Sequence, residues 1–209
     1  MSRALFIIDV QNDFTEGGAL GVEGGDAVAL GITRMLREHP HRYRHVFASR
    51  DWHDAGSDNG GHFAAEPDFV DTWPVHCVAG TRGAEYDPGL DVSAVDVHVR
   101  KGMGEPAYSI FDGVTVPTGG GADAAGPGAA GPGTVAEALD ALGVTDVDVV
   151  GIATDYCVRA SALDALAAGR RVRVLTDLVA GVAAASSVAA LDEIVAAGGR
   201  LATSDAASV

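Results

Sequence analysis

The sequence predicts an α/β fold in three layers, α/β/α, with a mainly parallel six-stranded sheet and helices on both faces. Short, apolar, β-branched segments alternate along the chain with longer segments whose apolar residues recur at a spacing close to 3.6. This alternation is typical of βαβ units, in which helices cover both faces of a parallel sheet. The 209 residues fit a single domain, 1–209, with no internal repeat and no credible boundary.

Six segments have the composition of buried strands. They are short, rich in apolar and β-branched side chains, and bounded by polar or glycine-containing stretches. Consecutive segments of this kind, joined by helices, are expected to pair in parallel. The six predicted strands are residues 4–10, 45–49, 95–101, 147–152, 171–176 and 200–204.

Four segments between these strands are predicted helices. Asp26 leads the first, whose apolar residues fall on one face. Thr134 and Glu137 have the spacing of a capping box at the start of the second. The third follows the fourth strand directly, and either Ser186 or Ser187 is expected to cap the last.

Two irregular segments stand apart from this alternation. Residues 50–90 form a long loop that is rich in histidine and aromatic side chains, which argue against disorder. Loops of this length inside a compact domain are usually functional. Residues 118–133 are dominated by glycine, alanine and proline, and we expect a flexible surface insertion there.

Composition and charge exclude several classes of function. The net charge of −15 argues against nucleic acid or an anionic membrane as a partner. No apolar run reaches the roughly 18 residues of a membrane span. The N-terminus lacks the pattern of a secretory signal, and two cysteines do not make a disulfide framework. We therefore expect a cytoplasmic protein with reduced thiols, and either a monomer or a homo-oligomer fits the sequence.

Three chemically complementary side chains lie at the ends of three different predicted strands. Asp9 lies at the end of the first, Lys101 ends the third, and Cys157 lies in the first helical turn after the fourth. Ligands of open α/β sheets bind at the carboxyl ends of the strands. A thiol near a lysine and a helix N-terminus has a lowered pKa, and a carboxylate can take its proton. Each residue alone also fits a capping, solvated or core role; the three together favour catalysis.

The long loop also concentrates side chains that bind metals. Asp51 and His53 point the same way if the backbone is extended, and His62 and His76 follow. Imidazole and carboxylate groups suit zinc, iron or manganese. Histidines occur elsewhere in the chain as well, so scattered loop histidines are the alternative. The spacing of the first pair and the concentration in one loop favour a metal.

These residues match a known family. The chain resembles the nicotinamidases (pyrazinamidases) of the isochorismatase-like cysteine hydrolase superfamily over almost its whole length. Asp-Val-Gln-Asn-Asp-Phe and Thr-Asp-x-Cys-Val mark the superfamily. Asp-x-His, Gly-His-Phe and Trp-Pro-x-His-Cys are typical of its metal-binding nicotinamidase branch. The matching segments are residues 8–14, 49–53, 61–63, 73–80, 100–102, 108–109 and 151–158.

The resemblance implies the isochorismatase-like hydrolase fold and an amidohydrolase that converts nicotinamide, and also pyrazinamide, to the acid and ammonia for NAD salvage. It implies a triad of Asp9, Lys101 and Cys157 that works through a thioester. It also implies an oxyanion hole made by the backbone N–H groups of Ala153 and Cys157, beside a cis peptide bond between Ile152 and Ala153.

The resemblance further implies one divalent metal ion, zinc or else iron or manganese, held by Asp51, His53, His62 and His76. The residues implied to line the pocket for an aromatic amide are Phe14, Trp73, Tyr108, Ile152 and Tyr156. The chain departs from the family pattern in two places. Position 156 is tyrosine where relatives often carry histidine. The first two ligand histidines are also a few residues further apart, with Gly60 and Gly61 in the added length.

Three other functions compete with this hypothesis. Relatives that hydrolyse carbamoyl or ureido compounds generally lack the histidines of the loop. A catalytically silent binding protein on the same scaffold would not need Asp9, Lys101 and Cys157 together. Enzymes that hydrolyse the vinyl ether of isochorismate lack the nucleophilic cysteine. Cys77 could be a ligand, a disulfide partner or a bystander, and a bystander is favoured because the ligand set is already complete.

Overall fold

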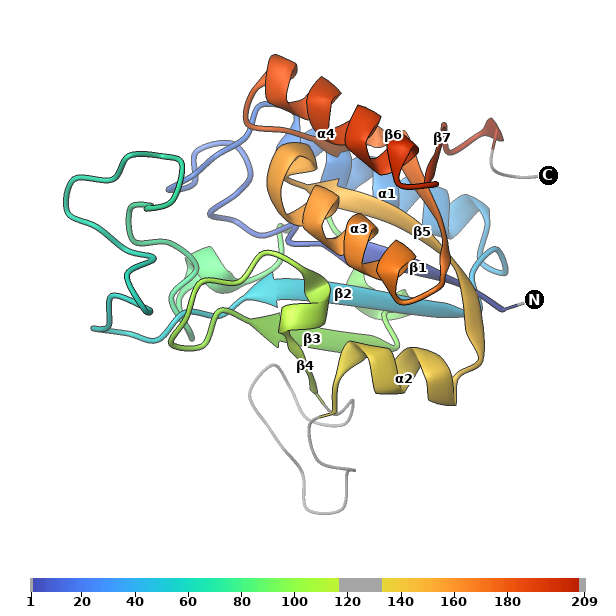
Figure 1. Ribbon diagram of the computed structural model, residues 1–209, viewed down its shortest axis with the longest axis horizontal. Coiled ribbons are helices and arrows are strands. Elements are labelled where there is room, and N and C mark those ends of the chain that lie inside the picture. The colour runs from blue at the N-terminus through green and yellow to red at the C-terminus, as the bar shows by residue number, and fades with distance from the viewer. Residues whose placement is uncertain (1, 117–132, 207–209) are drawn as a thin grey trace.

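The computed structural model describes residues 2–116 and 133–206 and contains one seven-stranded sheet, in the order β4-β3-β2-β1-β5-β6-β7. Only β4 is antiparallel to its neighbour; the other pairs are parallel. Figure 1 shows the sheet as the middle layer of the molecule. The strands are β1 (Ser2–Ile8), β2 (His45–Asp51), β3 (Val97–Lys101), β4 (Val114–Val116), β5 (Val144–Ile152), β6 (Arg171–Ala180) and β7 (Arg200–Ala202).

The predicted fold class is confirmed, but the predicted number of six strands is wrong. The strand that the sequence did not predict is β4, which pairs with β3 through Val114 opposite Arg100 and Val116 opposite His98. It has only three residues, all of them half-buried. A segment this short contains too few alternations for hydrophobic periodicity to distinguish it from a loop.

Within the described residues, four α-helices cover the two faces of the sheet. The first, α1 (Gly25–Glu38), packs on one face, and α2 (Val135–Ala141), α3 (Arg159–Ala167) and α4 (Ala184–Ala196) pack on the other. In Figure 1, α3 and α4 lie in front of the sheet and α1 lies behind it. No helix in the described residues is long and apolar enough to cross a membrane.

The central strand β1 shows why both faces of the sheet must be covered. Phe6 and Ile8 point into the core beneath α2, α3 and α4, whereas Leu5 and Ile7 point into the core beneath α1. All four side chains are fully buried. A strand with apolar side chains on both faces is stable only between two layers, which fixes the three-layer arrangement.

One of the two predicted helix caps is present in the structure, and the other is not. Thr134 and Glu137 form the capping box at the start of α2. The prediction of a serine cap for α4 is wrong, because the cap position is Ala183 and both serines lie inside the helix. The hydroxyl of Ser186 instead donates to Asp155, 2.5 Å away, which ties α4 to the turn after β5.

The segment between β2 and β3 follows an irregular path with two short 3-10 turns, Arg82–Ala84 and Val92–Ala94. In Figure 1 its first part extends beyond the carboxyl end of β2. The insertion predicted at 118–133 lies, except for its last residue, outside the described residues. The organisation as one domain with a metal-binding loop at 50–90 stays a prediction.

Candidate active site

Asp9, Lys101 and Cys157 meet at the carboxyl ends of neighbouring strands. Asp9 directly follows β1, Lys101 ends β3, and Cys157 lies in the turn Thr154–Val158 that follows β5. The Lys101 Nζ atom is 2.9 Å from Asp9 Oδ2 and 3.7 Å from Cys157 Sγ. The ammonium therefore lies between the carboxylate and the thiol, and all three side chains are buried.

Hydrogen bonds fix the Asp9 carboxylate and the Lys101 ammonium in place. Ser49 lies on β2, between β1 and β3. It donates its hydroxyl to Asp9 Oδ1 at 2.7 Å and accepts the Asp9 N–H at 3.3 Å. Lys101 also donates to the Ala107 carbonyl at 3.2 Å and to Asp51 Oδ1. The ammonium thus connects the cysteine to a second carboxylate on β2.

Burial and charge set the protonation states of this group. Burial lowers the pKa of Lys101, but the Asp51 and Asp9 carboxylates outweigh burial and hold that pKa well above its usual value. Burial raises the pKa of Asp9, and the opposing effect of Lys101 is smaller. Burial also raises the pKa of Cys157 well above its usual value, although Lys101 acts to lower it. The sequence predicted a lowered thiol pKa; the difference arises because the thiol is buried beside two carboxylates.

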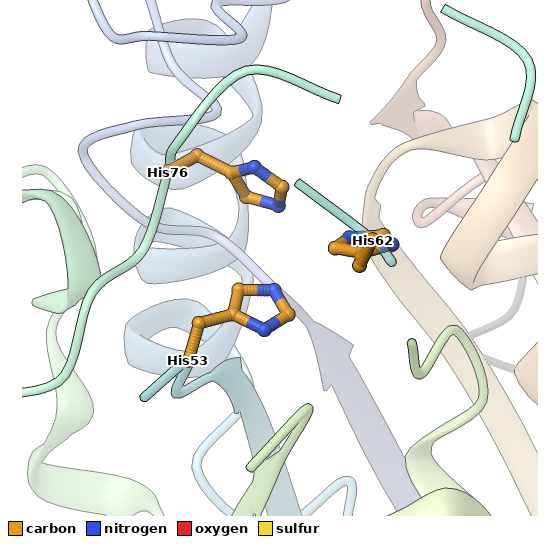
Figure 2. A group of neighbouring side chains, drawn as sticks. All are labelled: His53, His62 and His76. Atoms are coloured by element: carbon orange, nitrogen blue, oxygen red, sulfur yellow. The ribbon is translucent and has the colours of Figure 1, made fainter. Parts of the chain in front are cut away.

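Three histidines of the long loop converge next to the triad. Each of His53, His62 and His76 offers a ring nitrogen, and these nitrogens all lie within 4.8 Å of one another. Figure 2 shows the three rings arranged around a common point, each reached from a different part of the loop. All three residues are buried.

Hydrogen bonds orient two of the rings toward that point. The Nδ1 atoms of His53 and His76 are 2.7 Å and 2.8 Å from the carbonyls of Gly102 and Pro74. Because a carbonyl can only accept, Nδ1 carries a proton in each ring, and Nε2 is the nitrogen left to face the common point. Both Nε2 atoms face Asp51 Oδ2, at 3.6 Å and 3.7 Å. Metal-binding histidines are commonly fixed in this way by their second nitrogen.

The donor set fits a divalent metal ion. Buried His53 Nε2 has no hydrogen-bond partner, and ligands about 2.1 Å from a zinc ion are about 3–3.5 Å apart, close to the distances from Asp51. Burial raises the pKa of Asp51, but Lys101, His53 and His76 outweigh burial and hold it well below its usual value. Burial and the two other histidines lower the pKa of His62 to about 4. An ionised carboxylate and a neutral imidazole are the forms that bind metals.

The added length between His53 and His62 forms a tight turn. Asn59, Gly60 and Gly61 have consecutive φ angles of 51°, 69° and 84°, a left-handed region that glycine enters at little cost. The Asn59 side chain accepts the N–H of Asp54 at 2.8 Å and so closes the turn. This turn brings His62 back toward His53.

The two groups share one cavity of about 570 Å³. Its wall contains Cys157, Asp51, His62 and His76, together with Ala153 from the turn after β5. Four of the five residues predicted to bind substrate also line it, namely Phe14, Trp73, Tyr108 and Tyr156. The fifth, Ile152, is buried in the core and does not line the cavity. The peptide bond that joins Ile152 to Ala153 is cis.

The aromatic residues form a continuous wall. Trp73 donates its indole N–H to the Tyr108 hydroxyl at 3.0 Å. The ring of Tyr156 is edge-on to Trp73, with centroids 5.1 Å apart, and stacks on Tyr108 at 6.1 Å. A flat aromatic molecule fits such a wall, and its reacting group would lie next to Cys157.

Comparison with known proteins decides the family. The model of the Isochorismatase domain matches residues 3–117 and 126–206. The chain belongs to the isochorismatase domain family. A nicotinamidase/pyrazinamidase of Mycobacterium tuberculosis is 47% identical over 193 residues, which cover 92% of this chain and 94% of that relative. A nicotinamidase of Escherichia coli is 34% identical, covering 86% and 84%.

Solved structures of isochorismatase relatives have the same fold. PnC1 from L. infantum, in complex with nicotinate, superposes with a TM-score of 0.79 at 32% identity, covering 98% of this chain and 94% of that one. A pyrazinamidase of Pyrococcus horikoshii in complex with zinc superposes with a TM-score of 0.76 at 32% identity, covering 97% and 99%. Within the isochorismatase family, the chain belongs with the nicotinamidases.

Sequence reasoning gave no role to several residues that hold this isochorismatase site in place. The buried Gln11 amide donates to the Asp51 carbonyl at 2.9 Å and accepts the Asp51 N–H at 2.8 Å. Ser49 holds Asp9 as described above. Both residues lie inside matched segments, so the signal was present, but residue type alone does not reveal a hydrogen bond to a segment 40 positions away.

Proposed function

We propose that this chain is a nicotinamidase that hydrolyses nicotinamide, and also pyrazinamide, to the carboxylic acid and ammonia for NAD salvage. One observation carries the proposal: Cys157, which lies against the buried Lys101–Asp9 pair, lines an aromatic cavity together with Asp51 and with His62 and His76 of the histidine cluster. The names of the relatives from Mycobacterium tuberculosis and Escherichia coli support the same activity.

The first half of the proposed reaction forms a thioester. Asp9 takes the proton of Cys157, and Sγ attacks the carboxamide carbon. The backbone N–H groups of Ala153 and Cys157 stabilise the oxyanion, and losing one such donor typically raises the barrier by about 2.7–4 kcal/mol. Protonated Asp9 then gives its proton to the amide nitrogen, the C–N bond breaks, and ammonia leaves. The raised pKa values of Asp9 and Cys157 suit this exchange, because the proton is shared between two groups that both resist ionisation.

The second half reverses the first with water as the nucleophile. A water molecule gives a proton to Asp9 while the oxygen of that water attacks the thioester carbon. The C–S bond breaks, the carboxylic acid forms, and Cys157 regains its proton. Lys101 stays charged throughout and offsets the charge that moves between Asp9 and Cys157. Because its ammonium is 2.9 Å from Asp9, no rearrangement is needed between the two halves.

Asp51, His53, His62 and His76 are the residues that would hold the metal. We propose zinc, with iron or manganese as alternatives; the zinc complex of the pyrazinamidase from Pyrococcus horikoshii supports the choice. The bound ion would supply a Lewis acid for the pyridine ring nitrogen, directly or through a water molecule. Trp73 and Phe14 would then hold the two faces of the ring, and the carboxamide would lie against Cys157.

The partner is proposed to be a small aromatic amide. The nicotinate complex of the protein from L. infantum supports this class of ligand. We further propose a cytoplasmic protein, monomeric or homo-oligomeric, that does not bind nucleic acid; the acidic charge of −15 supports the last point.

Ammonia release from nicotinamide tests the proposal. The wild type, supplied with zinc, should release ammonia, and Cys157→Ala should lose activity by at least about a thousandfold, as nucleophile removal does in other acyl-transfer enzymes. Cys77→Ala is the matched control, because Cys77 is the other buried cysteine and should keep near-wild-type activity. An inactive wild type with metal bound would overturn the function. An active Cys157→Ala variant would overturn the thioester.

A further inference from the structure

The cavity extends outward beyond the residues that the proposed reaction uses. Its outer lining contains apolar side chains from three separate loops, Leu20, Phe69 and Val182, together with the exposed Glu23. Phe69 and Val182 are each 56% exposed, although both are large and apolar. Exposed apolar side chains on the rim of a binding site are typical of contacts with a ligand.

The loop that carries Phe69 is held in one shape. Its two ends are joined by the bridge between Phe63 and Trp73. Near its tip, the Asp68 carboxylate accepts the N–H groups of Val70, Asp71 and Thr72, each at 2.9 Å. These bonds keep the pKa of Asp68 below its usual value.

The position of Phe69 follows from this turn. Its φ angle is 59°, which is uncommon for a residue with a large side chain, and the turn around Asp68 maintains it. The Phe69 ring is edge-on to Trp73, with centroids 6.3 Å apart. The aromatic wall of the inner site therefore continues to the rim through Phe69.

Val182 lies in a segment far along the sequence from Phe69, and a side chain near Cys157 fixes its backbone. Asp155 accepts the N–H of Val182 at 3.0 Å and that of Ala183 at 3.2 Å. Asp155 is buried and stands two residues before Cys157. The hydrogen bonds to Asp155 thus fix Val182 relative to Cys157, which is two residues along the chain from Asp155.

The cavity is larger than its proposed substrate requires. Cavities of roughly 300–1,000 Å³ enclose drug-sized ligands, whereas nicotinamide is one six-membered ring with one carboxamide. A volume of about 570 Å³ leaves the outer, apolar part free when such a ring lies in the inner part.

We propose that Phe69 and Val182 are specificity-determining residues that bind an apolar substituent on the ring of the substrate. The inference rests on the proposed nicotinamidase function and adds a substrate class to it, alkyl-substituted pyridine carboxamides. The substituent belongs at ring position 5, the only carbon adjacent neither to the ring nitrogen nor to the carbon that bears the carboxamide. An alkyl group there leaves both the ring nitrogen and the reacting carbon uncrowded.

The test compares kcat/KM for 5-propylnicotinamide and nicotinamide in the wild type, Phe69→Ala and Val182→Ala. Truncation of either rim side chain should lower kcat/KM for the propyl compound about tenfold or more, mainly through KM, since apolar pockets discriminate alkyl groups by roughly 10–200-fold. The value for nicotinamide should change less than threefold. Val70→Ala is the matched control: Val70 is 64% exposed, lies next to Phe69, and does not line the cavity.

The ratio of the two kcat/KM values separates this inference from the proposed function. An equal loss for both compounds, no loss for either, or an equal effect of Val70→Ala would overturn the role of the rim. A wild type that hydrolyses neither compound would overturn the proposed function instead. A wild type that hydrolyses nicotinamide but not the propyl compound would leave the function standing and overturn the substrate class.

Discussion

The site consists of two regions, the triad and the histidine cluster, which different parts of the fold position. The triad is built on strand ends, so the order of β3, β2, β1 and β5 in the sheet brings Lys101, Asp9 and Cys157 together. The histidine cluster is built on one irregular segment, and single hydrogen bonds to backbone carbonyls orient His53 and His76. A sheet positions residues as part of the fold, whereas a loop needs additional bonds to do so.

The two regions also handle charge differently. In the triad, a buried ammonium balances buried carboxylates, so the charges are supplied entirely by the protein. In the histidine cluster, three imidazole rings and Oδ2 of the Asp51 carboxylate are directed at one point, and Lys101 bonds to the other oxygen of that carboxylate. The triad should therefore keep its arrangement when the metal is removed, whereas the histidine cluster should not.

Removing Lys101 is expected to have the largest effect on this comparison. Lys101→Met leaves Asp9 and Asp51 buried without their cation, and breaking a buried ion pair in this way costs about 3–5 kcal/mol of unfolding free energy. Ammonia release should fall at least about a hundredfold, because Asp9 no longer has the charge that keeps it a base. Urea unfolding and the ammonia assay measure the two effects.

A double variant separates the two effects of Lys101. Lys101→Met combined with Asp9→Asn removes the unpaired Asp9 charge, so it should regain part of the lost stability and none of the activity. If the double variant is no more stable than Lys101→Met, the charge balance between Lys101 and Asp9 is not what stabilises the triad.

Loss of one ring from the cluster is expected to have an intermediate effect. His53→Ala should weaken zinc binding by at least about 10–100-fold, the range for perturbing the groups around a bound metal. Its unfolding free energy without metal should change little compared with Lys101→Met. Metal content after dialysis against a weak chelator gives the answer, and His98→Ala on β3, outside the cluster, is the control. Unchanged zinc content in His53→Ala would remove the proposed site.

The smallest expected effect is a dependence of stability on pH that originates in the cluster. His62 has a pKa of about 4 in the folded chain and about 6.5 when unfolded, so the unfolded state binds more protons between these values. Unfolding free energy of the metal-free protein should therefore rise with pH from about 4 to about 6.5, by about 1–2 kcal/mol, since solvent in the cavity screens part of the shift.

The variant His62→Asn isolates this contribution. It lacks the titrating ring, so the slope of unfolding free energy against pH should be shallower in this window than in the wild type. Chemical unfolding at several pH values in the presence of a chelator measures the slope. Equal slopes would mean that His62 is not the group responsible.

The same contrast explains what the sequence could predict. Asp9, Lys101 and Cys157 were found because each lies at the end of a strand or just after it, and parallel strands bring their carboxyl ends to one edge. The spacing of Asp51 and His53 and the family resemblance indicated the ligands, and the left-handed turn at Gly60 and Gly61 explains how His62 joins them.

What the sequence could not predict depends on contacts between distant segments. Ser186 has the residue type of a helix cap, but its hydroxyl donates to Asp155, 31 residues earlier. Phe69 and Val182 reach one rim from segments more than a hundred residues apart. The thiol pKa depends on how deeply Cys157 is buried beside two carboxylates. Local propensity and periodicity contain no information about these distances.

Asp51 belongs to both regions, because Oδ1 accepts from Lys101 and Oδ2 faces His53 and His76. The charge of this one carboxylate would therefore be divided between the ammonium and any cation bound by the histidines. By thermodynamic linkage, a change in metal occupancy shifts the proton affinity of the triad, and a change in triad protonation shifts metal affinity by the same factor. The proton affinity of the triad and the affinity of the histidine cluster for a cation are consequently two measurements of a single coupling free energy.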